Sequence, residues 1–149
     1  MQRSQHQGKK RLFGSERGTA AVEVALLLPW IVVSFIAVLD FGFSAYALIA
    51  TQNAARIAAT WGSASQANST ALTTSPALTC GTYALPEFRY APTPVIACGS
   101  ALSATATPDS IGTVNTVKVA VSYTVGLIAI PGIMPNSLTI TKNVYMPVR

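Results

Sequence analysis

Residues 17–39 read RGTAAVEVALLLPWIVVSFIAVL, and this stretch decides the architecture because sixteen consecutive residues, 24–39, carry no charge. A helix of about 20 apolar residues is long enough to cross the hydrocarbon core of a bilayer. One carboxylate, Glu23, lies immediately before the uncharged run. A charge at the end of a membrane span is costly unless it is paired or near the interface, so such an acid is by default a functional residue. The stretch therefore predicts a membrane helix with a functional Glu23.

The positive charge of the chain is concentrated before this helix. The leader 1–18 has five Lys or Arg residues and one acid, a net charge of +4, whereas the remaining 131 residues have five basic and four acidic residues, a net charge of +1. Lys and Arg beside a span stay on the cytoplasmic side, which predicts a cytoplasmic N-terminus and an exported C-terminal part. Nucleic-acid binding is not expected, because no basic stripe with interleaved aromatic residues follows the leader.

The length of the apolar helix matches a bilayer. The 21 steps from Thr19 to Asp40 rise about 32 Å, close to a hydrocarbon core of about 30 Å. Asp40 is then expected at the outer interface, inside an aromatic belt. The residues of that belt are Phe41, Phe43 and Tyr46. Helical pattern continues to Gly62. A secretory signal peptide is the competing interpretation, but its apolar core is shorter and ends at a small-residue cleavage site that is missing here.

Small residues form rows along the outer half of this helix. Ala50, Ala54 and Ala58 recur at a spacing of four, and a second row starts at Ala47. Such rows let another helix, or the exported part of the same chain, approach closely. The alternative is that the alanines serve helix propensity alone.

The exported part, 63–149, begins with a polar, small-residue stretch, 63–76, that predicts a flexible connection. Cys80 and Cys98, the two cysteines of the chain, follow it. An oxidising exterior favours a disulfide between them, which in the loop-entropy model stabilises the fold by about 3 kcal/mol. Metal binding and redox catalysis are not expected, because two cysteines without an exported histidine are too few ligands and their spacing is far from Cys-x-x-Cys.

The rest of the exported part favours β-structure. Residues 117–125 alternate between apolar and polar side chains, and Leu138 and Ile140 repeat that period, so the two segments are expected to pair as antiparallel strands. Two further strands are expected within 79–113. Residues 86–94, with three prolines and two aromatic residues, predict a stiff exposed loop that either contacts a partner or packs its rings on its own domain. The predicted fold is α+β: a long N-terminal transmembrane helix extending into a small disulfide-bonded antiparallel β-sheet domain.

Several of these motifs together resemble a known family. They are Gly18 to Glu23 followed by the apolar run to Pro29, then Asp40-Phe41-Gly42, 52–56, the strand 117–123, 138–141 and the closing 146–149. The chain is similar in these stretches to the TadE-like minor pilins (pseudopilins) of Tad, or Flp, pilus systems. The resemblance implies a bacterial inner-membrane protein that helps to assemble or initiate a thin adhesive, type IV-like pilus. Its implied partners are the inner membrane, other pilins, pilus assembly proteins and a prepilin peptidase.

The same resemblance implies that a prepilin peptidase cuts between Gly18 and Thr19, with Glu23 as the fifth mature residue. Glycine leaves a protease groove open and lets the backbone extend before the helix begins. The new amine of Thr19 then lies one helical turn from Glu23, and a neighbouring subunit's amine is an equal candidate partner, so that Glu23 marks the register between packed helices. Val24 departs from the commonest prepilin pattern, in which an aromatic residue often follows the Glu.

The expected organisation is a cytoplasmic basic leader, 1–18, a transmembrane and extended helix, 19–62, and an exported β-rich domain, 63–149. The alternative to a pilus assembly protein is an uncleaved single-pass anchor whose exported domain binds a surface ligand or envelope partner. An enzyme is not expected, because the one histidine, His6, is in the leader and the exported acids Glu87 and Asp109 are far apart in sequence. No cofactor is implied.

Overall fold

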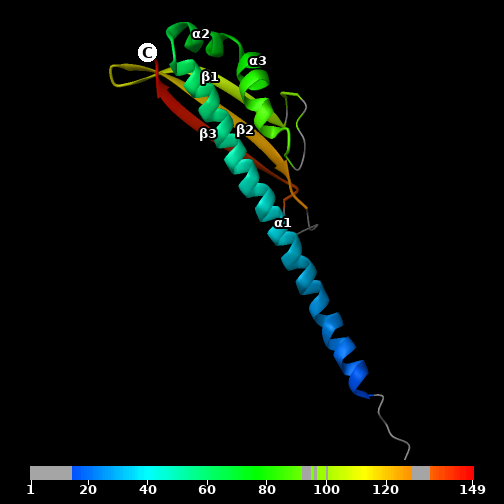
Figure 1. The fold of residues 1–149 in the computed structure, drawn as a ribbon. Coiled ribbons are helices and arrows are strands. Elements are labelled where there is room, and N and C mark those ends of the chain that lie inside the picture. Colours follow the sequence, from blue (N-terminus) through cyan, green and yellow to red (C-terminus); the bar gives the residue numbers. More distant parts are fainter. Residues whose placement is uncertain (1–14, 92–94, 96, 100, 129–134) are drawn as a thin grey trace, which may run out of the picture. The chain divides into compact units, whose positions relative to one another are not determined.

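The computed structural model of the chain describes residues 15–91, 95, 97–99, 101–128 and 135–149 (Figure 1). These residues form two compact units, one that ends at Ala37 and one that spans Val38–Arg149. The elements are a long helix, α1 (Ser15–Ser63), short helices α2 (Gln66–Thr74), α3 (Pro76–Leu78), η1 (Thr79–Ala84) and η2 (Leu85–Phe88), and strands β1 (Leu102–Ile111), β2 (Val114–Gly126) and β3 (Ser137–Pro147). The predicted α+β class, with an apolar N-terminal helix and an antiparallel sheet, is confirmed.

Helix α1 is long and apolar enough between Gly18 and Ser63 to cross a membrane. It ends one residue after Gly62, where the sequence predicted its end, and it runs through Pro29 as one helix. Within residues 18–37 most of the large apolar side chains are exposed, Trp30 at 73%, and Ile36 is partly buried. Exposed apolar residues on a helix of this length are what a lipid environment would cover.

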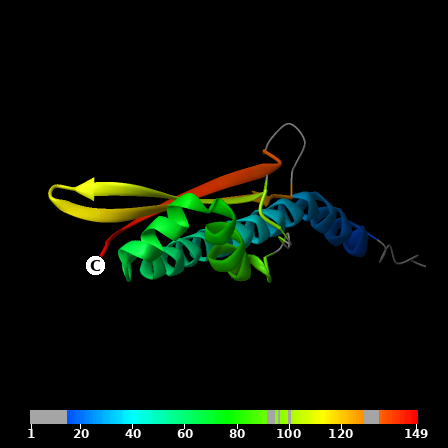
Figure 2. The same ribbon diagram turned by 90° about the horizontal axis from the view of Figure 1, so that it is seen from above.

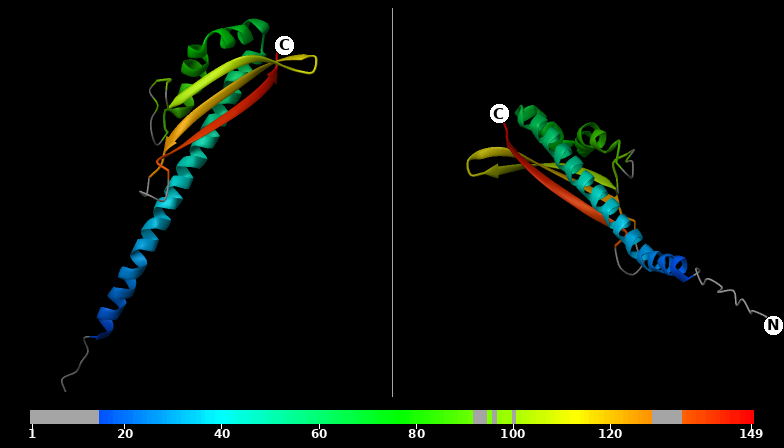
Figure 3. Two further views of the ribbon diagram at one scale, coloured as in Figure 1. Left: turned by 180° about the vertical axis from the view of Figure 1, so that it is seen from behind. Right: turned by 60° about the horizontal axis from the view of Figure 1, so that its bottom comes forward.

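The core of the unit Val38–Arg149 joins the outer part of α1 to the sheet. The two rows of small residues on α1 are buried, with Ala47, Ala54 and Ala58 at 0% exposure, and they belong to one hydrophobic cluster with the inward side chains of β2. Small side chains allow the sheet to lie close against the helix (Figures 1 and 3). The interpretation that these rows admit the chain's own exported part is thus the one that the structure bears out.

The sheet is antiparallel in the order β1-β2-β3. Val117, Val119, Val121, Tyr123 and Val125 of β2 are all fully buried, as their alternation predicts, and Val119 pairs with Ala106 on one side and Val144 on the other. The predicted pairing of 117–125 with 138–146 is confirmed. Gly112 adopts a φ of 64° in the β1–β2 turn, which favours glycine, and this turn projects beyond the other elements of its unit (Figure 2).

Two expectations for 63–113 are wrong. Residues 66–74 form helix α2 in place of a flexible connection, because the Ser65 hydroxyl accepts a hydrogen bond from the Asn68 backbone N–H and the Asn68 amide donates to the Trp61 carbonyl. Leu72 of α2 is fully buried. The segment 79–88 is also helical, so the described residues of 79–113 supply one strand, β1, and not two. The composition of the segment does not reveal that one side chain is buried or that one serine caps a helix, so the prediction missed α2.

The loop 86–94 is only partly what the sequence predicts. Phe88 is fully buried, with its ring 4.5 Å from that of Tyr123, whereas Tyr90 is 82% exposed. Of the two alternatives, Phe88 therefore packs on its own domain. Pro92, Thr93 and Pro94 lie outside the described residues.

Candidate functional site

The predicted processing junction lies near the start of α1. Gly18 and Thr19 are exposed, and a Cβ added at Gly18 meets no atom within 4 Å. The sequence suggested an extended backbone at Gly18. In the structure helix α1 already begins at Ser15, so Gly18 is helical. A protease would have to unwind this turn, and glycine makes that easier because it is about 1 kcal/mol less favourable than alanine inside a helix. Cleavage at Gly18 remains a prediction.

Glu23 lies on the same helix, four residues after Thr19, and is exposed. Residues at this spacing are neighbours on a helix surface. Glu23 is thus an exposed acid inside a membrane-capable helix. Its partner in the pilus-assembly interpretation is the amine at residue 19 of the same or a neighbouring chain, and this role stays a prediction.

Asp40 is a residue whose role the sequence missed. It was expected at an open interface, but it is only 7% exposed, and its Oδ1 accepts a hydrogen bond of 2.9 Å from the backbone N–H of Ile128. The predicted belt around it is also divided: Phe41 is 77% exposed, whereas Phe43 and Tyr46 are half-buried against the core. The Tyr46 hydroxyl donates to the Glu87 carbonyl oxygen at 3.2 Å. No local pattern announces a partner 88 residues away.

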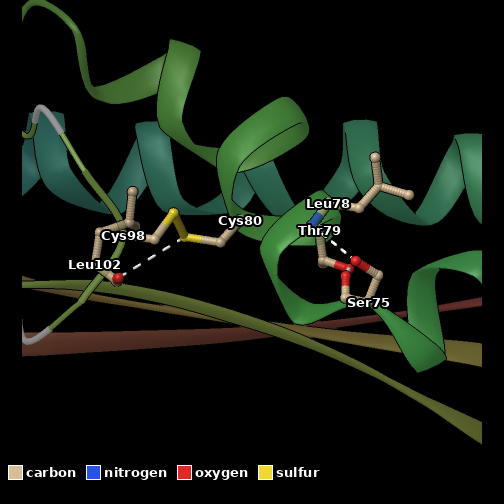
Figure 4. The surroundings of a disulfide bond; sticks show 6 residues. All are labelled: Ser75, Leu78, Thr79, Cys80, Cys98 and Leu102. Atoms are coloured by element: carbon tan, nitrogen blue, oxygen red, sulfur yellow. Dashed lines mark hydrogen bonds between the residues drawn. A yellow bond between two sulfur atoms is a disulfide. The ribbon is translucent and has the colours of Figure 1, made fainter.

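The disulfide between Cys80 and Cys98 is formed, with the two Cα atoms 6.1 Å apart (Figure 4). Cys80 of η1 is buried, and its Sγ lies 3.8 Å from the carbonyl oxygen of Leu102 at the start of β1, a contact and not a proton donation because a half-cystine carries no S–H. On the other side of η1, the buried Thr79 hydroxyl donates to the Leu72 carbonyl at 3.0 Å. The disulfide therefore links η1 to Cys98, four residues before β1 begins.

The described cavities offer little for chemistry. One cavity, with a volume of about 450 Å³, opens where the end of α1 meets the C-terminal residues. Its lining is Thr60, Ser63, Ala64, Met146, Pro147 and Arg149. Arg149 is the one ionisable side chain among these, so no acid–base pair faces the cavity. Among the residues that the structure describes, no group of three or more His, Cys, Asp or Glu side chains is placed to hold a metal ion.

A comparison with protein families gives the N-terminal helix an identity. Residues 18–60 match the family model described as TadE-like protein. The chain is TadE-like in this segment. The searches of curated proteins and of solved structures found no match.

The TadE-like segment begins at Gly18 and includes Glu23, Asp40 and the buried alanine rows. It ends near the end of α1, so the disulfide and the three strands lie outside it. The match of residues 18–60 to the TadE-like model suggests a structural, Tad pilus-associated protein. The long apolar helix fits a single-pass membrane anchor in such a protein.

Proposed function

We propose that this protein is a minor pilin, or pseudopilin, that takes part in the assembly or initiation of a Tad pilus. It is anchored in the inner membrane by the N-terminal part of α1, with residues 1–18 in the cytoplasm and 63–149 in the periplasm. The observation that carries the proposal is the TadE-like match over 18–60 on a helix that is long and apolar enough to span a membrane. Its partners are other pilins and pilus assembly proteins.

Glu23 supports an assembly role through its position. A solvent-exposed ion pair contributes at most about 1 kcal/mol to the stability of the folded chain. Between packed helices the same carboxylate sets the register, because removing one partner of a buried pair leaves an uncompensated charge. Glu23 is therefore expected to matter more for association than for folding.

Glu23→Gln tests this role, since it keeps the shape and the hydrogen-bonding groups but removes the charge. The variant is expected to insert and accumulate like the wild type, while the number of pili per cell and co-purification with other pilins fall. Asp109→Asn is the matched control, because it removes one carboxylate charge from an exposed residue of β1. Normal piliation in the Glu23→Gln strain, at normal protein level, would show that Glu23 is only an interfacial residue.

Gly18→Leu tests processing, and with it the choice between a pilin and an uncleaved anchor. If a prepilin peptidase cuts after Gly18, the mass of the membrane-extracted wild type lacks residues 1–18 and the variant retains them. Gly42→Leu is the control, because Gly42 is another exposed glycine of α1 with open space around it. Equal masses for the wild type and the Gly18→Leu variant would rule out cleavage at this site.

A further inference from the structure

The bond between Asp40 and Ile128 joins two segments with very little charge. Asp40 is the one charged residue in 24–55, a run of 32 residues, and 119–141, a run of 23, contains none. The Asp40 Oδ1 atom accepts a hydrogen bond of 2.9 Å from the backbone N–H of Ile128, which lies just beyond the end of β2 at Gly126. The Leu127 N–H donates to the Asn136 carbonyl at 3.0 Å and closes the base of the β2–β3 connection. This base is therefore held at the level of α1 where the uncharged membrane-length run ends.

Apolar side chains remain uncovered at this level of the unit Val38–Arg149. Val38 is 70% exposed, Phe41 is 77% exposed and Ile128 is 40% exposed, while Leu127 is half-buried against the core. We call these four residues the collar. The charge of Asp40 does not interrupt it, because that carboxylate is turned inward and is hydrogen-bonded by a backbone N–H.

We infer that the collar lies in the outer interfacial region of the bilayer, at the boundary between lipid headgroups and acyl chains, and that Asp40 is the positioning residue that holds Leu127 and Ile128 there. This inference rests on the single-pass anchor of the proposed function. Continuity with the anchor favours lipid as the occupant: Val38 and Phe41 belong to the membrane-capable helix Gly18–Ser63, and Ile128 is hydrogen-bonded to Asp40 of the same helix. Interfacial segments bury their apolar residues several ångströms into this boundary, where aromatic rings are favoured.

The depth of the collar is measured with nitroxide labels on the full chain in phosphatidylcholine vesicles, with the native disulfide intact. Ile128→Cys places the label in the collar. Ile111→Cys is the matched control, because Ile111 is a 60% exposed isoleucine at the β1–β2 turn. That turn is at the other end of β2, about 40 Å away at about 3.3 Å per residue. Leu28→Cys reports on the anchor itself. Accessibility to oxygen and to a water-soluble nickel complex is compared at the three sites.

We expect the labels at residues 28 and 128 to favour oxygen and lose nickel accessibility, and the label at 111 to favour nickel. If 128 behaves like 111 while 28 stays shielded, the collar inference is wrong and the anchor stands. If all three sites are open to nickel, the anchor and the collar both fail. If 128 is shielded from both reagents in proportion to the protein-to-lipid ratio, a second copy covers the collar and the lipid inference is wrong. A label at Phe41→Cys gives the same test should Ile128→Cys not fold.

The role of Asp40 is tested by amide exchange at Ile128 in the same vesicles. Asp40→Ala removes the acceptor and is expected to abolish protection of the Ile128 N–H and to make the label at 128 nickel-accessible. Asp40→Asn keeps an acceptor oxygen in place, so both readouts should stay close to the wild type. Unchanged protection and depth in the Asp40→Ala protein would overturn the assignment of Asp40 as the positioning residue.

Discussion

Phe88→Ala should destabilise the unit Val38–Arg149 strongly, although the sequence places Phe88 in a proline-rich loop. The side chain is fully buried, and its ring lies 4.5 Å from that of Tyr123, which is itself fully buried in the centre of β2. Truncating a buried Phe to Ala costs about 3–5 kcal/mol, of which an aromatic pair of this kind supplies about 0.5–1.5. At a urea dependence of about 2 kcal/mol per molar, the unfolding midpoint falls by about 2 M.

The matched control is Tyr90→Ala. Tyr90 is an aromatic residue two positions further on, but it is 82% exposed, so its removal should change the free energy of unfolding by about 0.5 kcal/mol or less. Urea unfolding of the full chain in detergent is followed by the fluorescence of Trp61, whose ring lies 5.1 Å from that of Tyr83. A Trp30→Phe background makes Trp61 the one tryptophan. Equal midpoint shifts for the two variants would refute the assignment of Phe88 to the core.

Two further predictions concern how the short helices are held. Thiol labelling of protein from intact cells, under denaturing and non-reducing conditions, should find neither Cys80 nor Cys98 free, and replacing both by Ala should lower the free energy of unfolding by about 3 kcal/mol; two labelled thiols would contradict this. A Cβ at Gly62 would lie 2.6 Å from Leu72 Cδ1, so Gly62→Ala should lower the free energy of unfolding by an overpacking cost of about 1–3 kcal/mol. Gly42→Ala, with no atom within 4 Å, should leave it unchanged or raise it; the same response at both glycines would contradict the packing around Gly62.

The sequence by itself determined the features that depend on near neighbours along the chain. The run 24–39 predicts a membrane-capable helix because it is long and uncharged. The alternation in 117–125 predicts a half-buried strand, because every second residue of a strand lies on the same face. The chain has two cysteines, which left one intramolecular pairing to consider, and the disulfide is present. The TadE-like character of 18–60 follows from the same local pattern.

Only the tertiary structure decided what depends on residues far apart in the chain. Phe88 and Tyr90 lie in the same proline-rich segment, so composition does not distinguish them. Phe88 is buried because its ring packs against Tyr123, whereas Tyr90 is left exposed. Asp40 looked like an interfacial charge, but the backbone N–H of Ile128 becomes its partner once β2 is laid along α1. A side chain's burial and hydrogen-bond partners are properties of the assembled core, and the free energy of a buried polar group depends on a partner that local sequence does not contain.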